Sequence, residues 1–125
     1  AQGEANGVLE ENLAKERMVS AAQREGFRRA NAAGVKMVFG SDAGVMPHED
    51  VGGQFAIMVR FGMTPLQAIQ AATVNAADAL GQTGDVGVIA PGAWGDLIAV
   101  DGDPLADVGE LADVDAVIKG GKRVK

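Results

Sequence analysis

The stretch Val35-Lys36-Met37-Val38-Phe39-Gly40-Ser41-Asp42-Ala43-Gly44 decides the fold class. Its first five residues form a short, largely apolar run between Gly34 and Gly40, which is typical of a buried strand in a parallel sheet. Small residues follow the run, at the end of the strand where α/β folds place the loops that carry their chemistry. The stretch therefore predicts an α/β protein with a functional rim near residue 42.

Helical patterns lie on both sides of this expected strand. Residues 7–33 carry small and apolar residues at near-helical spacing, and Gly34 is a natural helix end. We expect this helix to cover the sheet with its small-residue stripe. After the strand, Asp50 can cap a second helix that carries apolar residues as far as Gly62.

The clearest helix start in the sequence is Thr64-Pro65-Leu66-Gln67. It combines a capping Thr, a Pro at the first helical position and a Gln three residues after the cap. The pattern predicts one helix that ends at Gly81, with a buried stripe that includes Leu66 and Leu80. Thr73 and Asn75 are polar in this otherwise apolar helix, so we expect them to hydrogen-bond backbone at a packed joint.

Beyond Gly81 the pattern changes to β structure with frequent glycines. The segment 97–100 is the best strand, and residues 116–119, Gly120-Gly121 and residues 122–125 have the pattern of a two-residue hairpin. The sequence thus divides into an α/β part over residues 1–81 and a small β part over residues 82–125.

Composition limits the possible functions. The chain has 125 residues, which is room for one domain, and 47 % of them are hydrophobic. Its net charge of −6 disfavours nucleic-acid binding, and no apolar run approaches the ~18 residues of a membrane span. Without cysteine there is no disulfide, thiolate metal site or cysteine nucleophile, and the single histidine cannot build a zinc site alone.

Asp42 and His48 are the candidate functional residues. Asp42 directly follows the expected strand among small residues, where its carboxylate can bind a metal and accept a proton from water. The spacing equally fits an Asx turn or a helix cap, which is the commoner use of such an aspartate. His48 can contact substrate in the same loop, and its alternative is a solvent-exposed histidine near a helix start.

The order of several motifs then resembles the C-terminal end of a metal-dependent amidohydrolase, in particular the Xaa-Pro dipeptidase and imidazolonepropionase-like group. The resemblance covers residues 8–125. It is carried by residues 38–44, Pro47-His48, residues 62–69, residues 72–77, residues 87–98 and residues 117–122. In that family the fold is a (β/α)8 TIM-type barrel flanked by a β-sandwich that both chain ends build.

The resemblance implies which part of that fold this chain forms. Residues 1–81 would be the end of the barrel, with residues 36–41 as its eighth strand. Residues 82–125 would be the C-terminal portion of the flanking β-sandwich. A complete barrel needs ~250 residues, so we expect an N-terminal part of the same enzyme to precede this chain.

The resemblance also implies a function. The parent protein would hydrolyse an amide or peptide-like C–N bond in a small-molecule or dipeptide-like substrate, with water activated by one or two divalent metal ions such as Zn²⁺. Asp42 would bind the metal and transfer the proton, and the remaining ligands would lie upstream. The 125-residue chain alone would be inactive. A homo-oligomer is expected from the family, with no nucleic-acid or membrane partner.

Two alternatives stay open at this point. The chain could be a non-catalytic structural or binding module that self-associates to cover the faces a full barrel would bury. A nucleotide-binding α/β domain is a third possibility, against which the absence of a phosphate-binding loop motif argues. The substrate, the metal and the cellular compartment are not specified by these residues.

Overall fold

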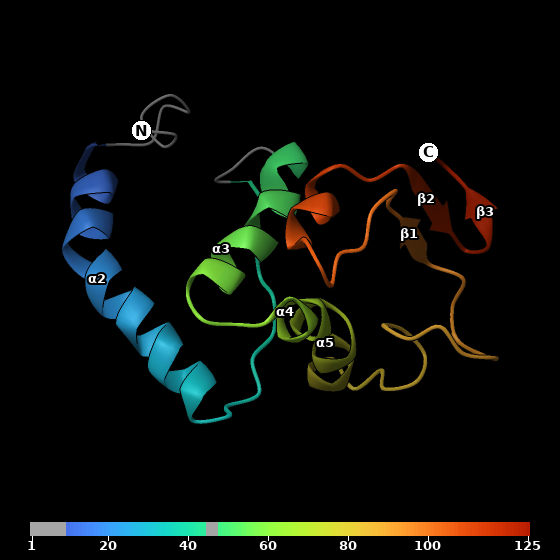
Figure 1. Cartoon of the computed structure of the whole chain (residues 1–125), viewed down its shortest axis with the longest axis horizontal. Helices are drawn as coiled ribbons and strands as arrows, with labels where there is room; N and C mark the ends of the chain where they lie inside the picture. Colours follow the sequence, from blue (N-terminus) through green and yellow to red (C-terminus); the bar gives the residue numbers. More distant parts are fainter. Residues whose placement is uncertain (1–9, 45–47) are drawn as a thin grey trace.

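The structure, a computed structural model, describes residues 10–44 and 48–125 (Figure 1). Helices make up the first part of the chain and a small antiparallel sheet the last, so the expected mixture of helix and strand is confirmed. The elements in chain order are α2 (Glu10–Ala32), η1 (His48–Gly53), α3 (Gln54–Arg60), α4 (Pro65–Ala72), α5 (Val74–Ala79), β1 (Leu97–Ala99), η2 (Val108–Ala112), β2 (Ala116–Lys119) and β3 (Lys122–Arg123). Within the described ranges, no helix has both the length and the apolar character that crossing a bilayer requires.

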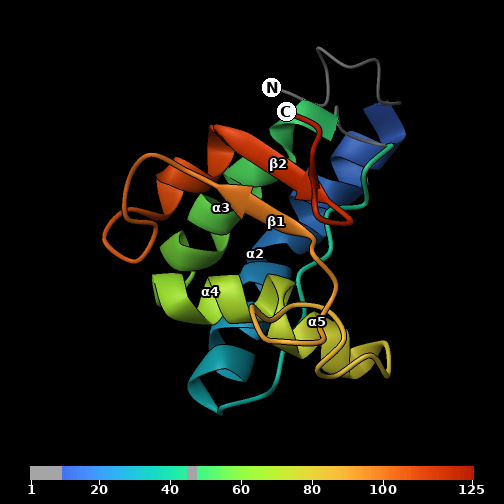
Figure 2. The ribbon, with the colours of Figure 1, turned by 90° about the vertical axis from the view of Figure 1, so that its right-hand side faces the viewer.

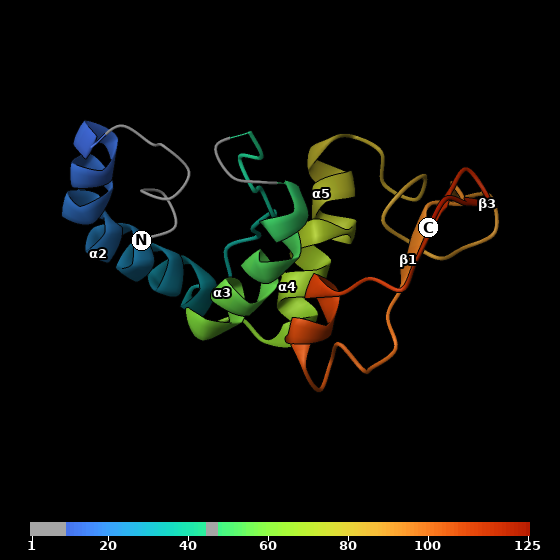
Figure 3. The same ribbon diagram turned by 90° about the horizontal axis from the view of Figure 1, so that it is seen from above.

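Helix α2 confirms the first expected helix but not its burial. It ends where Gly34 takes a φ of +71°, a left-handed conformation that glycine adopts without steric cost. Its N-terminal half points away from α3–α5 in Figures 1 and 3, and Met18 and Val19 are 83 % and 44 % exposed. The expectation of a stripe packed on a sheet is therefore wrong for this half, because no described sheet lies beneath it.

The C-terminal half of α2 contacts α3 through Phe61. Three guanidinium groups lie over this ring, those of Arg24, Arg28 and Arg60, at 5.6, 5.1 and 5.9 Å from its centroid. Two of them come from α2 and one from α3. Cation–π attraction therefore links the two helices at this end.

Residues 35–42 run as an extended segment to which no strand is assigned, which corrects the expectation of a buried strand (Figure 1). Val35 and Val38 are 55 % and 51 % exposed. A strand exists by virtue of a ladder with a neighbouring strand. Here Met37 and Phe39 bond to helices α4 and α5 instead, as described below.

The helix expected from Asp50 begins later than the sequence pattern predicts. Residues 48–53 form the 3₁₀ turn η1, and α3 follows with Gly53 at its N-cap and no side-chain cap. Two adjacent glycines weaken an α-helix at this point. A Cβ on Gly52 would lie 2.5 Å from the carbonyl oxygen of Leu111, so this glycine also allows η1 to approach η2 closely.

Helix α4 confirms its predicted start. The Thr64 hydroxyl accepts a hydrogen bond from the Gln67 N–H at 3.2 Å, and the Gln67 side chain accepts one from the Thr64 N–H at 2.8 Å. The single helix expected as far as Gly81 is instead two, α4 and α5. They are separated at Thr73, whose φ of −120° and ψ of −95° leave the helical region.

The core lies where α3, α4 and the extended segment meet. Its buried members are Met63, Ala68 and Ala71, and the rings of Phe39 and Phe55 stack beside them with centroids 4.8 Å apart. The expected stripe of α4 and α5 is wrong at both ends, since Leu66 is 51 % and Leu80 is 73 % exposed. The buried residues of α4 are Ala68 and Ala71.

The last part of the chain forms a three-stranded antiparallel sheet in the order β1-β2-β3. Leu97 pairs with Ile118 and Lys119 with Lys122, and Figure 2 shows β1 and β2 side by side with opposite directions. Gly120 and Gly121 have φ values of +56° and +75°, as a tight type I′ hairpin requires, so the predicted hairpin is confirmed. The sequence pattern did not predict η2.

Candidate functional site

Asp42 lies at the C-terminal end of the extended segment and is exposed to solvent. Its φ is +49°, the only positive φ of a non-glycine residue in the described part of the chain. Such a backbone is uncommon for residues with a Cβ, and aspartate tolerates it better than most. No described residue donates a hydrogen bond to its carboxylate, and residues 45–47, whose N–H groups a helix cap at Asp42 would bind, lie outside the described residues, so the cap alternative stays open.

The helices α4 and α5 hold the segment that leads to Asp42. The Phe39 N–H donates to the Ala71 carbonyl at 2.9 Å, and the Asn75 amide donates to the Met37 carbonyl at 3.0 Å. The Thr73 hydroxyl donates to the Ile69 carbonyl at 2.8 Å. The expectation that Thr73 and Asn75 bond backbone at a packed joint is confirmed.

An ion pair that sequence reasoning missed fastens the start of the same segment. The Lys36 ammonium lies 2.5 Å from the Asp78 carboxylate, to which the Thr83 hydroxyl also donates at 3.0 Å. The hydrogen bond from Lys36, that from Thr83 and the charge of Lys36 together hold the pKa of Asp78 below its ordinary value. No local signal in the sequence pairs two residues that are 42 positions apart.

His48 opens η1, but its side chain lies outside the described residues, as do residues 45–47. The contact of His48 with substrate therefore stays a prediction. Among the described side chains, no group of three His, Asp, Glu or Cys residues could hold a metal ion. A catalytic zinc site needs about three ligands from the protein, so these described side chains do not form one by themselves.

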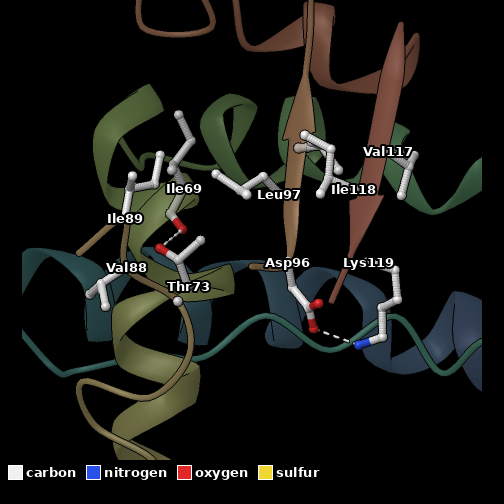
Figure 4. Close-up of a pocket in the computed structure, with 11 residues that line it drawn as sticks. Ile69, Thr73, Val88, Ile89, Asp96, Leu97, Val117, Ile118 and Lys119 are labelled. Carbon is white, nitrogen blue, oxygen red and sulfur yellow. Dashed lines mark hydrogen bonds and ion pairs between the residues drawn. The ribbon is translucent and has the colours of Figure 1, made fainter. Parts of the chain in front are cut away.

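A separate pocket of about 540 Å³ lies between α4, residues 87–89 and the sheet. Figure 4 shows aliphatic side chains around it, with the pair Asp96 and Lys119 at one edge. The Lys119 ammonium lies 2.5 Å from the Asp96 carboxylate, which also accepts from the Gly120 N–H at 2.7 Å. These hydrogen bonds lower the pKa of Asp96 from its ordinary value. Asp42 is not among the residues that line this pocket.

Residues 1–124 match the sequence model of the Amidohydrolase family. The chain belongs to the amidohydrolase family. The resemblance noted in the sequence is therefore confirmed, and family membership implies a TIM-type barrel to which these helices and extended segment are related.

Among curated proteins, this amidohydrolase chain is 35 % identical over 123 residues to the ochratoxinase of Aspergillus niger, an alignment that covers 95 % of the chain and 25 % of the relative. It is also similar to the solved structure of a Xaa-Pro dipeptidase with methionine bound in the active site, with 42 % identity and a TM-score of 0.78 over 82 % of this chain and 25 % of that one. A prolidase complexed with N-methylphosphonate-L-proline has 38 % identity and a TM-score of 0.84 over 95 % of this chain and 30 % of that one. The chain spans about a quarter of the length of the curated ochratoxinase that it matches.

Proposed function

We propose that this chain is part of a hydrolase that cleaves an amide or peptide-like C–N bond, and that Asp42 is the catalytic carboxylate it contributes. Family membership and the similarity to a prolidase and an ochratoxinase support the reaction class. The observation that carries the role of Asp42 is its position, exposed and in a left-handed conformation at the end of a segment tied to two helices. A small amide or a dipeptide is the substrate class.

In this proposal Asp42 both binds a divalent metal, which we take to be Zn²⁺, and moves one proton. A bound metal would supply Lewis acidity, which lowers the pKa of water and polarises a carbonyl group. One Oδ atom of Asp42 accepts the proton of the attacking water. The same carboxylic acid then donates that proton to the leaving amine as the C–N bond breaks.

The remainder of the catalytic apparatus comes from elsewhere in the protein. One carboxylate cannot hold a catalytic metal, so we infer that further ligands come from the rest of an enzyme, and that the 125-residue chain alone is inactive. We assign residues 1–81 to the end of the barrel and residues 82–125 to part of a flanking β-sandwich. His48 is a proposed substrate contact, and the enzyme is a proposed homo-oligomer.

Substitution of Asp42 in the full-length protein tests this function. With Zn²⁺ added, we expect Asp42→Asn to lower kcat on Xaa-Pro dipeptides and N-acyl amino acids at least about 10²-fold, since it loses the acid–base group. The thermal midpoint should stay unchanged because the side chain is exposed. Asp101→Asn, another exposed aspartate, is the matched control and should keep full activity. Unchanged kcat in Asp42→Asn, or no amide turnover by the metal-loaded wild type, would refute the proposal.

A second candidate is a non-catalytic module that self-associates. One observation favours it, namely the large apolar side chains that this chain leaves exposed. They include Met18 at 83 %, Leu80 at 73 %, Ile89 at 90 % and Trp94 at 65 %. Native mass spectrometry of the 125-residue chain and amide turnover by the full-length protein with Zn²⁺ added separate the two. A stable homo-oligomer without amide turnover supports the module, whereas amide turnover supports the hydrolase.

A further inference from the structure

We propose that Asn75 is a positioning residue for Asp42, an inference that rests on the catalytic role proposed for Asp42. The extended segment that ends at Asp42 has no strand ladder within the described residues. Its backbone polar groups bond instead to the joint between α4 and α5. Within the described residues, the joint is therefore the partner of these backbone groups.

The two backbone contacts have the geometry of one side of a ladder. In an extended chain, the carbonyl of one residue and the N–H of the residue two positions later face the same neighbour. The Met37 carbonyl accepts from the Asn75 amide at 3.0 Å, and the Phe39 N–H donates to the Ala71 carbonyl at 2.9 Å. A side-chain donor and a main-chain acceptor thus bond the same side of the segment.

The break at Thr73 leaves the Ala71 carbonyl without a partner inside α4. The last carbonyls of a helix have no partner within it. In α4 the Ile69 carbonyl accepts from the Thr73 hydroxyl at 2.8 Å, the Gln70 carbonyl from the Thr73 N–H at 3.3 Å, and the Ala71 carbonyl from Phe39. The three carbonyls are therefore satisfied, one of them by the segment that carries Asp42.

The hydrogen bond from Asn75 to Met37 is better protected from water than the ion pair of Lys36 with Asp78. The hydrogen bond of Asn75 is partly buried. The side chains of Lys36 and Asp78 are 57 % and 53 % exposed, so solvent screens their attraction. Only Gly40 and Ser41 separate Phe39 from Asp42, and a displacement of about 1 Å at a catalytic group can lower a rate about 10²-fold.

The test uses the full-length enzyme and substitutions at Asn75. Asn75→Asp keeps the size of the side chain but replaces the donor to Met37 by a carboxylate oxygen, and Asn75→Ala removes the group. We expect both to lower kcat about 10²-fold with KM within about threefold of wild type. Asp78→Asn, which weakens the exposed contact to the same segment, should stay within threefold in kcat.

Two further variants separate positioning from a loss of stability. Thr64→Ala weakens the N-terminus of α4 and should lower the thermal midpoint with kcat retained below it. In the Asp42→Asn background, Asn75→Asp should cause no further loss of residual kcat, because both act on one group. If Asn75→Ala is not recovered folded, the isosteric Asn75→Asp carries the same test.

The outcomes distinguish this inference from the proposed function. Wild-type kcat in Asn75→Asp together with an inactive Asp42→Asn would overturn the positioning role alone. A rise in KM with kcat unchanged, or losses that add in the double variant, would overturn it as well. Full activity of Asp42→Asn would instead overturn the catalytic role on which the inference rests.

Discussion

The close approach of Gly87 to the α4–α5 joint gives a quantitative prediction. A Cβ placed on Gly87 would lie 2.6 Å from the Thr73 carbonyl oxygen and 2.7 Å from its carbon, and both are backbone atoms that cannot rotate away. Gly87 also has a φ of +74°. We expect Gly87→Ala to lower the free energy of unfolding for two reasons. The left-handed backbone costs about 1–2 kcal/mol, and the steric conflict costs about 1–3 kcal/mol more.

Gly81→Ala is the matched control for the backbone contribution. Gly81 has a φ of +68°, and a Cβ there would meet no atom within 4 Å. Gly81→Ala should therefore lower the free energy of unfolding only by the backbone contribution, about 1–2 kcal/mol. Urea unfolding gives both losses of unfolding free energy. Hydrogen exchange at the Ala77 N–H, which donates to the Thr73 carbonyl at 2.9 Å, reports the joint directly.

The difference in unfolding free energy between Gly87→Ala and Gly81→Ala decides whether the steric conflict exists. Equal losses of unfolding free energy, or unchanged exchange at Ala77 in Gly87→Ala, would show that residue 87 does not press on the joint. Either result would refute the steric conflict expected between a side chain at position 87 and the Thr73 carbonyl. A surplus of about 1–3 kcal/mol in Gly87→Ala would support it.

Two other predictions concern stability. Thr64→Ala should lower the free energy of unfolding by about 1 kcal/mol, because the capping hydroxyl that accepts from Gln67 is lost; an unchanged urea midpoint would contradict this. The pKa of Asp96 lies below its ordinary value of 3.8 in the folded protein because Lys119 and Gly120 hydrogen-bond its carboxylate. The stability that Asp96 contributes is therefore fully present above that ordinary value and is lost as pH falls through the lower folded pKa. Asp96→Asn should narrow the gap between the thermal midpoints at pH 7 and pH 3, and an equal gap in both proteins would count against the contact.

Local chemistry made several elements predictable from the sequence. The capping box at Thr64 and the hairpin around Gly120-Gly121 each depend on residues within a few positions, and both are confirmed. The helix ends at Gly34 and Gly81 follow equally local rules, since glycine takes the left-handed conformation there. Signals of this kind need no knowledge of the rest of the chain.

Features that depend on distant partners could not be predicted in the same way. The apolar run 35–39 has the composition of a strand, yet its backbone groups bond helices α4 and α5. The sequence predicted that Asn75 bonds backbone, but not that Met37 is its partner. No local pattern predicted the break at Thr73 or the close approach of Gly87 to it. At the candidate site, the position of Asp42 after the run was predictable, whereas its left-handed backbone and the ion pair of Lys36 with Asp78 were not.

The contact between Asn75 and Met37 also has a consequence for the order of folding. The two residues are 38 positions apart, so the partner of the extended segment is made well after the segment itself. At ~5–20 residues per second, a ribosome needs roughly 2–8 s to add that many residues. Until then, the backbone groups of residues 37 and 39 lack the partners found in the structure. The segment that carries Asp42 therefore reaches its final position only after the α4–α5 joint has been synthesised, and a slow interval in translation just after residue 42 would prolong its exposure to other chains.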